Sequence, residues 1–335
     1  MFYIGIDVSK NTLDYAYRNN ELNQAAYLSQ CTNDQDGFEQ LVAEINQLNG
    51  EQETVFVVIE PTGGYESRCV HHLIAQGWQV ALPNPKFIKD FGSSRGRRSK
   101  TDQVDAKLIC EYGFERKPKT HTLLSTKVEA MRDLLQRKHD LEKLIRAEKN
   151  RLKQYQQRPR QTLAVNSSLE RILETLEQEM AQVERELEEI VKNDCVISGQ
   201  ITRLLTLPGI GPKTVWYLFV HLALCHTLTD GNGTASMVVA MAGVDPEHFQ
   251  SGTSIAKPPR ISKKGNKLIR QKLFMGALGG VSGNNPLSDF YQRLIGRGKA
   301  KKKALVAAIR KILVWGWAIF IKEVDFDPAL AAAKS

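Results

Sequence analysis

Short apolar runs alternate with polar connections through the first third of the chain. They predict five β-strands, at residues 3–8, 12–18, 25–31, 54–59 and 78–82. The first three runs follow one another closely, which favours an antiparallel meander. The fourth is apolar throughout, as expected of a strand buried on both faces. Apolar residues at helical spacing predict helices over 37–48 and 65–76.

Three antiparallel strands followed by parallel strands with helical crossovers is the ribonuclease-H-like order, so we predict an α/β domain with a mixed sheet. In that fold the first and fourth strands are neighbours. Asp7 and Glu60, at the ends of these strands, are therefore expected to emerge side by side. A second acidic motif opens a predicted helix, where Asp102 and Asp105 lie three positions apart and face the same way.

These four carboxylates predict a pocket for a divalent metal, because hard cations prefer oxygen ligands. Two Mg²⁺ ions held roughly 3.5–4 Å apart stabilise both the attacking and the leaving oxygen of a phosphodiester displacement. None of the four is specific alone, since an aspartate that ends a strand is often a cap or an ion-pair partner. Residues 91–100 are expected to form a flexible basic loop before the second acidic motif. A plain surface linker is the alternative to a phosphate-binding loop, whose contacts would be Arg95, Arg97, Arg98 and Lys100.

Heptad spacing dominates the middle of the chain, from about 127 to 192. One seam runs through Leu169, Leu173, Leu176, Met180, Val183, Leu187 and Ile190. A weaker seam precedes it and is interrupted by Lys138 and Glu148, and a polar turn at 154–162 separates the two. The pattern fits an antiparallel helical hairpin or an intermolecular coiled coil equally well. In both cases it predicts a spacer or dimerisation arm without chemistry.

The last part of the chain is expected to be mostly helical. The stretch 204–213 resembles a helix–hairpin–helix, in which Gly209 and Gly211 expose backbone N–H groups to a phosphate and Lys213 adds charge. An ordinary helical turn is the alternative. Further elements are expected as a helix at 235–242, a turn-rich segment at 243–259, and helices at 266–276 and 301–321.

Charge and cysteine content narrow the class of protein. The net charge of +9 is concentrated in the stretches 257–272 and 293–311, which contain no acid. Such stretches favour a polyanion partner over a merely solvated face, with contacts expected at Arg260, Lys263 and Lys264. The five cysteines are odd in number and far apart, which indicates a reducing compartment. No signal peptide is evident, and the apolar stretch 312–321 is too short to span a bilayer, so we predict a cytoplasmic protein with no membrane partner.

Several motifs together resemble a known family. Gly5-Ile-Asp7, Ile59-Glu60-Pro-Thr-Gly-Gly-Tyr65 and Lys100-Thr-Asp-Gln-Val-Asp-Ala106 are similar to the DEDD transposases of bacterial insertion sequences, which include the Piv-type DNA invertases. Further matches in the second half are Leu207-Pro-Gly-Ile-Gly211, Ala242-Gly-Val244, Gln250-Ser-Gly252 and Arg260-Ile-Ser-Lys-Lys-Gly-Asn266. Glu60 is followed by proline where many relatives have a small residue.

The resemblance implies a RuvC-like domain in which Asp7, Glu60, Asp102 and Asp105 bind Mg²⁺ or Mn²⁺. It also implies a serine nucleophile, Ser251 or else Ser254, that forms a phosphoserine link to DNA. From its surroundings alone, Ser251 would be a solvated loop residue. The family further implies donor and target double-stranded DNA, an element-encoded bridge RNA and a homodimer or homotetramer, in a bacterial protein associated with the nucleoid. Loops 91–100 and 257–272 would then contact nucleic-acid backbones.

Three other classes of protein remain to be separated from this one. A RuvC-like junction-resolving nuclease would use water as its nucleophile, and no protein–DNA adduct would form. Sugar kinases and actin-like ATPases share the opening strand, but they need a second nucleotide-binding half where this chain has heptads. A basic scaffold would have no metal-dependent activity. We predict a RuvC-like catalytic domain at 1–120, a coiled-coil linker or dimerisation arm at 121–198 and a C-terminal transposase domain at 199–335.

Overall fold

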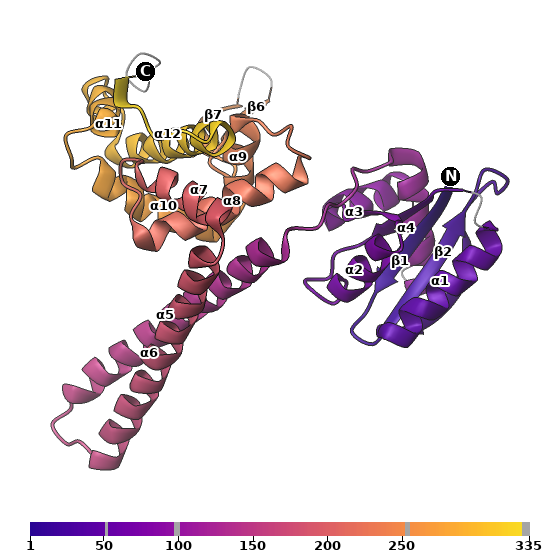
Figure 1. Ribbon diagram of the computed structural model, residues 1–335, viewed down its shortest axis with the longest axis horizontal. Coiled ribbons are helices and arrows are strands. Elements are labelled where there is room, and N and C mark those ends of the chain that lie inside the picture. The colour runs from indigo at the N-terminus through magenta and orange to yellow at the C-terminus, as the bar shows by residue number, and fades with distance from the viewer. Residues whose placement is uncertain (51–52, 97–100, 252–254, 330–335) are drawn as a thin grey trace. The chain divides into compact units, whose positions relative to one another are not determined.

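The computed structural model of the chain describes residues 1–50, 53–96, 101–251 and 255–329 (Figure 1). The chain divides into two compact units, Met1–Leu123 and Leu124–Ser335. Among the described residues, the first unit contains a five-stranded sheet, and the second contains the long helices and a two-stranded sheet. Residues 121–198, expected to form a separate arm, lie almost wholly in the second unit, together with the C-terminal helices.

A mixed five-stranded sheet forms the centre of the first unit. Its strands are β1 Phe2–Val8, β2 Thr12–Arg18, β3 Ala26–Thr32, β4 Val55–Ile59 and β5 Gln79–Ala81, in the spatial order β3-β2-β1-β4-β5. The first three strands are antiparallel, whereas β4 and β5 run parallel to β1. The meander and the pairing of the first and fourth strands are therefore confirmed. This arrangement is compatible with a ribonuclease-H-like domain.

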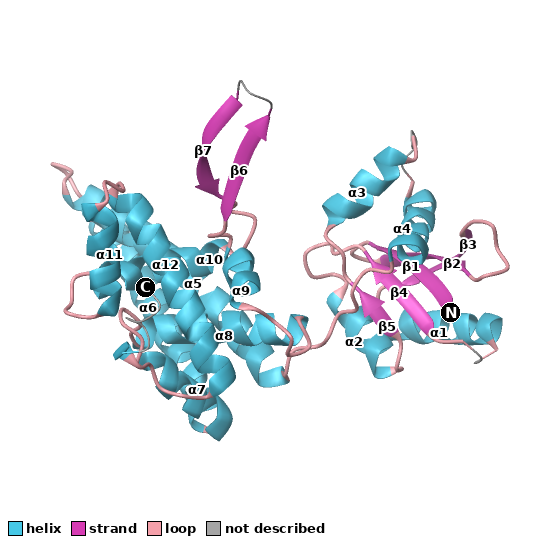
Figure 2. Cartoon of the chain, turned by 90° about the horizontal axis from the view of Figure 1, so that it is seen from above, coloured by secondary structure: helices cyan, strands magenta, loops and turns pink. Residues whose placement is uncertain are grey.

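Helices cover both faces of this sheet (Figure 2). They are α1 Gln35–Asn49, α2 Ser67–Ala75, α3 Pro85–Ser94 and α4 Asp102–Arg116. Alternate residues of β1 serve the two faces: Ile4 and Ile6 pack in the core with α1 and α2, and Tyr3 packs in the core with α3 and α4. Burial on both faces fixes β1, and with it Asp7, in one register.

The expected loop at 91–100 is wrong in its first part, because residues up to Ser94 continue helix α3. Asn84 caps this helix by accepting a hydrogen bond from the Lys86 N–H at 2.9 Å. Phe91 is buried and meets the Tyr112 ring edge-on, which holds the last turn of α3 against α4. Basic composition alone did not reveal this apolar anchor.

The heptad segments form a helical hairpin within the chain. Helix α5 covers Thr126–Gln156 and α6 covers Leu163–Lys192, and the two pack along each other (Figure 1). The Lys138 that interrupts the first seam is buried, with its Nζ 2.6 Å from Glu184 Oε1 on α6. An ion pair across the seam thus accommodates the charge inside the packed face. The hairpin alternative therefore describes this chain.

The C-terminal helices enclose the largest apolar core. They are α7 Cys195–Leu205, α8 Pro212–Leu228, α9 Ala235–Ala242, α10 Lys267–Gly280, α11 Pro286–Gly296 and α12 Lys301–Lys322. Helix α11 was not predicted. The apolar stretch 312–321, expected to be too short to span a bilayer, is part of the longer helix α12, which is long and apolar enough to cross a membrane. Half of the apolar part of α12 is, however, buried against the helices around it. We therefore interpret α12 as the core helix of this unit.

The segment expected to be turn-rich, 243–259, is instead mostly a β-hairpin (Figure 2). Strand β6 covers Pro246–Ser251 and pairs antiparallel with β7, Ile255–Ile261. In a sheet of only two strands each strand is an edge, so a proline whose missing N–H would face outward costs no ladder hydrogen bond.

Candidate active site

The carboxyl ends of β1 and β4 bring two of the predicted carboxylates to one edge of the sheet. The strands are parallel neighbours with Ile6 opposite Ile59, so Asp7 and Glu60 occupy equivalent positions at the ends of the paired stretch. Asp7 is partly buried at the end of β1, and Glu60 directly follows β4. The predicted adjacency of these two positions in the sheet is confirmed.

Helix α4 supplies the other two carboxylates. Thr101 caps the helix, its hydroxyl accepting from the Val104 N–H at 3.4 Å, so Asp102 and Asp105 fall in the first turn. Carboxylate oxygens of Asp7, Asp102 and Asp105 lie within 4.8 Å of one another. Three of the four predicted carboxylates therefore meet in one cluster, with Glu60 close enough to influence the charge of Asp7.

Gly5 makes this convergence possible. A Cβ atom at Gly5 would lie 2.1 Å from the Cys110 nitrogen and 2.4 Å from the Ala106 carbonyl oxygen. The backbone of α4 therefore touches that of β1, two residues before Asp7. Only a glycine permits so close an approach between a helix and a strand. Gly5, quoted above only as part of a motif, thus determines the distance between the two acidic motifs.

Repulsion among these groups changes the acidity of Asp7. Burial, and then the negative charges of Asp105, Glu60, Asp102 and Asp14, raise the pKa of Asp7 from 3.8 to about 6. A carboxylate surrounded by others is stabilised by a bound cation, which removes the repulsion. The donors are all oxygens, which matches the ligand preference of Mg²⁺ and Mn²⁺ rather than that of a softer metal. The residues therefore fit a divalent metal.

A fifth carboxylate, Asp14, was not identified from the sequence. It lies opposite Asp7 in the β1–β2 pairing and is only 4% exposed. The Tyr27 hydroxyl and the Gln30 amide each donate a hydrogen bond to it at 2.8 Å. Burial and the Asp14 carboxylate raise the pKa of Tyr27 to about 12, so the hydroxyl remains a donor. The predicted antiparallel strands at 3–8 and 12–18 offered a signal, since their short connection brings positions 7 and 14 near each other, but only the structure gives the register.

The basic residues expected near this site differ in what they contact. Arg95 forms an ion pair with Glu115 and a second with Glu111 at 3.8 Å, and its guanidinium lies over the Phe91 ring. The charge of Arg95 is therefore largely neutralised by acidic residues of the first unit. Arg97, Arg98 and Lys100 lie outside the described residues.

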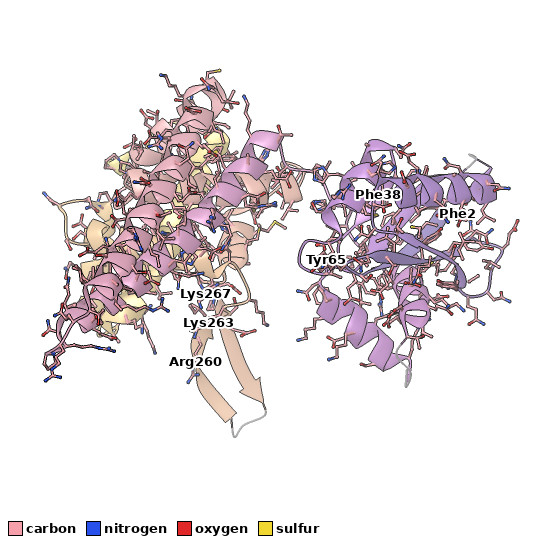
Figure 3. All side chains as sticks on the ribbon, turned by 90° about the horizontal axis from the view of Figure 1, so that it is seen from below. Phe2, Phe38, Tyr65, Arg260, Lys263 and Lys267 are labelled. Atoms are coloured by element: carbon pink, nitrogen blue, oxygen red, sulfur yellow. The ribbon has the colours of Figure 1, made fainter. Side chains whose placement is uncertain are left out.

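In the second unit, Ser251 is the last residue of β6 and pairs with Ile255 across the hairpin. Ser254 lies outside the described residues. Arg260 is exposed near the end of β7, and Lys263 follows at the base of the hairpin (Figure 3). Lys264 pairs with Glu247, which raises the pKa of the lysine. Arg260 and Lys263 therefore present charge beside the hairpin, while Lys264 is partly neutralised.

The predicted helix–hairpin–helix residues lie where α7 passes into α8: Gly209 and Gly211 are in the connection, and Lys213 is in the first turn of α8. Gly209 has a positive φ of 80°, and a Cβ there would lie 2.3 Å from the Gly276 carbonyl oxygen on α10. Packing against α10 thus explains this glycine without a phosphate. Gly211 is the N-cap of α8 and has open space around it, and Lys213 is exposed in the first turn. These two residues keep a geometry suited to an anion.

Comparison with known proteins matches both units. A family model described as "Transposase", of the DEDD type, matches residues 4–158, and a second, "Transposase IS116/IS110/IS902 family", matches residues 201–292. The "Pilin gene-inverting protein" of Moraxella lacunata is 30% identical over 332 residues, which is 97% of each chain. The chain belongs to the IS110 family of transposases. It is therefore a DNA transposase or recombinase.

Two more relatives agree with this assignment of the IS110-family transposase. The protein of the same description in Moraxella bovis is 30% identical over 333 residues, again 97% of each chain. An "Insertion element IS110 uncharacterized 43.6 kDa protein" of Streptomyces coelicolor is 29% identical over 110 residues, 32% of this chain and 25% of that protein. DEDD transposases typically use divalent metals, which agrees with the acidic cluster of this transposase.

Proposed function

We propose that this transposase cleaves and rejoins donor and target DNA with a divalent metal held by Asp7, Glu60, Asp102 and Asp105. The convergence of Asp7, Asp102 and Asp105 within 4.8 Å carries the proposal. Mg²⁺ is the metal we assign, with Mn²⁺ as its closest substitute. When bound, such an ion would neutralise developing charge on the phosphodiester oxygens. The role of the four side chains is to hold that charge at the carboxyl edge of the sheet.

We assign the nucleophile to Ser251. In the proposed step a bond forms between Ser251 Oγ and the phosphorus, the bond from phosphorus to one DNA oxygen breaks, and the hydroxyl proton leaves to a base. A hydroxyl of another strand then attacks the phosphoserine and releases Ser251, so the phosphodiester energy is conserved. Support comes from the position of Ser251 at the end of β6, in the region that the second family model matches.

The remaining assignments concern partners. We propose that Arg260, Lys263, Gly211 and Lys213 contact nucleic-acid backbones, which positions the strands without reading sequence. Sequence choice would fall to a bridge RNA that pairs with donor and target DNA. We further propose a homodimer or homotetramer that acts in the cytoplasm on nucleoid DNA. The excess of cationic residues in the second unit supports a polyanionic partner.

A cleavage assay tests the proposal. The full-length protein is incubated with donor and target DNA, the RNA transcribed from the flank of the element, and Mg²⁺. Products are run on a denaturing gel before and after protease treatment. The variants are Ser251→Ala, Ser254→Ala and Asp102→Ala. Ser282→Ala serves as the control, because Ser282 is an exposed serine of the same unit whose hydroxyl donates to the Leu278 carbonyl.

The expected product is a retarded DNA band that protease removes, lost in Ser251→Ala and Asp102→Ala and unchanged in Ser282→Ala. Loss in Ser254→Ala with retention in Ser251→Ala would move the nucleophile to Ser254. Cleavage that survives both serine substitutions without any adduct would refute the serine mechanism and identify water as the nucleophile. Activity without RNA would refute guidance by RNA.

A further inference from the structure

Side-chain hydrogen bonds organise the loop that follows Glu60. It joins β4 to α2 and turns through Gly63 and Gly64, whose φ angles are 89° and 134°. The Glu66 carboxylate accepts three hydrogen bonds from this loop: from the Thr62 N–H at 3.1 Å, the Thr62 hydroxyl at 2.9 Å and the Gly64 N–H at 2.9 Å. One side chain thus closes the loop on itself.

Asn33 fastens the same loop to its neighbours. Its amide donates to the Ser9 carbonyl oxygen at 2.9 Å and to the Tyr65 carbonyl oxygen at 3.1 Å. Ser9 follows β1 two residues after Asp7. Asn33 therefore joins the loops that leave β1 and β4, the two strands that carry Asp7 and Glu60. The backbone of Tyr65 is held in place relative to the acidic edge of the sheet.

Tyr65 itself, by contrast, is exposed on the surface of the first unit (Figure 3). It is 52% exposed, and among the described aromatic residues of this unit only Phe87, at 58%, is also more than half exposed. A fixed backbone that presents an uncovered aromatic ring has already lost conformational freedom that a ligand would otherwise have to remove. Such a ring suits stacking, since every nucleobase has a π face.

We infer that Tyr65 is a stacking surface for a base of the DNA strand whose phosphate is cleaved at the carboxylates. Tyr65 lies five residues after Glu60, so the two Cα atoms are at most about 17 Å apart. The stacked base therefore belongs to a nucleotide within a few positions of the scissile phosphate. Stacking accepts any base and would hold the strand without specifying its sequence. The inference rests on the proposed assignment of this edge of the sheet to DNA cleavage.

Photocrosslinking tests the inference in the full-length protein. The probe is a single-stranded DNA 12-mer of mixed sequence that carries 5-iodouracil in place of thymine, which joins to an aromatic ring stacked on it. Crosslinked peptides are identified by mass spectrometry. The peptide containing Tyr65 is expected to crosslink at least about fivefold more than the peptide containing Phe87, the lower limit of what stacking on one base contributes. Equal yields at the two peptides would mean random collision and would overturn the inference.

Asn33→Ala separates an organised platform from mere exposure. It leaves the Tyr65 ring in place and removes the two hydrogen bonds that fix the loop, so crosslinking at Tyr65 is expected to fall about 2- to 12-fold. An unchanged yield would overturn the inference. Tyr65→Phe should keep its crosslink to within about twofold, because stacking needs the ring and not the hydroxyl. Circular dichroism checks that Asn33→Ala folds, and the comparison of Tyr65 with Phe87 in the unaltered chain needs no variant.

The matching RNA 12-mer is run beside the DNA, and crosslinking of Tyr65 to RNA alone would also overturn the inference. Crosslinking requires binding and not strand cleavage, so the result is independent of the adduct assay. A Tyr65 crosslink without a phosphoserine adduct would leave the stacking surface and remove the serine mechanism. A phosphoserine adduct without a Tyr65 crosslink would support the serine mechanism and overturn the stacking surface.

Discussion

Replacement of Asp7 by asparagine tests the electrostatics of the acidic cluster. In the metal-free protein the folded state holds the Asp7 proton more tightly than the unfolded chain, since its pKa is raised from 3.8 to about 6. The folded state is therefore penalised when the carboxylate ionises. The penalty is absent below the unfolded pKa, grows between pH about 4 and 6 and is complete above pH 6. The Asp7→Asn variant does not pay this penalty, because an asparagine side chain cannot ionise.

The size of the effect follows from the same pKa. An undiminished change from 3.8 to about 6 corresponds to about 3 kcal/mol. Because Asp7 is only partly buried, screening by solvent lowers the expected value to about 1–2 kcal/mol. Metal-free Asp7→Asn should thus be more stable than the unaltered protein by this amount at pH about 7.5. The two should be nearly equal only below pH about 3.5.

Hydrogen exchange in EDTA is the suitable assay, because peptides from β1 and β4 report the opening free energy of the first unit by itself. Glu21→Gln, an exposed acid in the β2–β3 connection, is the control and should show no pH-dependent difference. Saturating Mg²⁺ should reverse the order, since a native-state ligand at 100 times its dissociation constant adds about 2.7 kcal/mol to the unaltered protein. Lower stability of metal-free Asp7→Asn at pH about 7.5 would refute the reasoning.

Three further outcomes are expected. Gly5→Ala should lower the free energy of unfolding of the first unit by about 3 kcal/mol and abolish activity, because its Cβ would meet the backbone of α4. Hydrogen exchange measures the stability and a strand-cleavage assay measures the activity; wild-type stability would contradict this. Lys272→Met should cost about 1–2 kcal/mol at pH about 7 by urea denaturation, because the 2.6 Å pair with Glu142 is lost. Although partial burial opposes it, the lysine lowers the pKa of Glu142, so the cost should shrink as pH falls below about 4; a pH-independent cost would refute the pairing. Exposed Cys195 should react with iodoacetamide in the folded protein, whereas Cys69, whose pKa burial raises to about 12, should react only on unfolding; labelling by mass spectrometry decides.

Much of the first unit followed from local pattern. Short, continuously apolar runs placed β1 and β4, and the acids that end them were therefore known to share one edge if the strands paired. Asp102 and Asp105 share a face because a helix repeats every 3.6 residues. The same reasoning could not show that the helix carrying Asp102 and Asp105 packs beside β1, close to Asp7. The heptads likewise predicted two long helices and left their pairing open.

The sequence by itself determined the strands of the first unit, the two long helices of the second and which acids end or begin these elements, because these features depend on residues a few positions apart. Helices α3 and α11 and the β6–β7 hairpin were missed. Tertiary structure alone decided which of the candidate residues are engaged in contacts within the protein and which stay accessible to a ligand. Arg95 is engaged by Glu115 and Glu111, Gly209 packs on α10, and Asp14 is buried beside Asp7. Each of these outcomes depends on a contact between residues far apart along the chain, and a periodic pattern carries no information about such contacts.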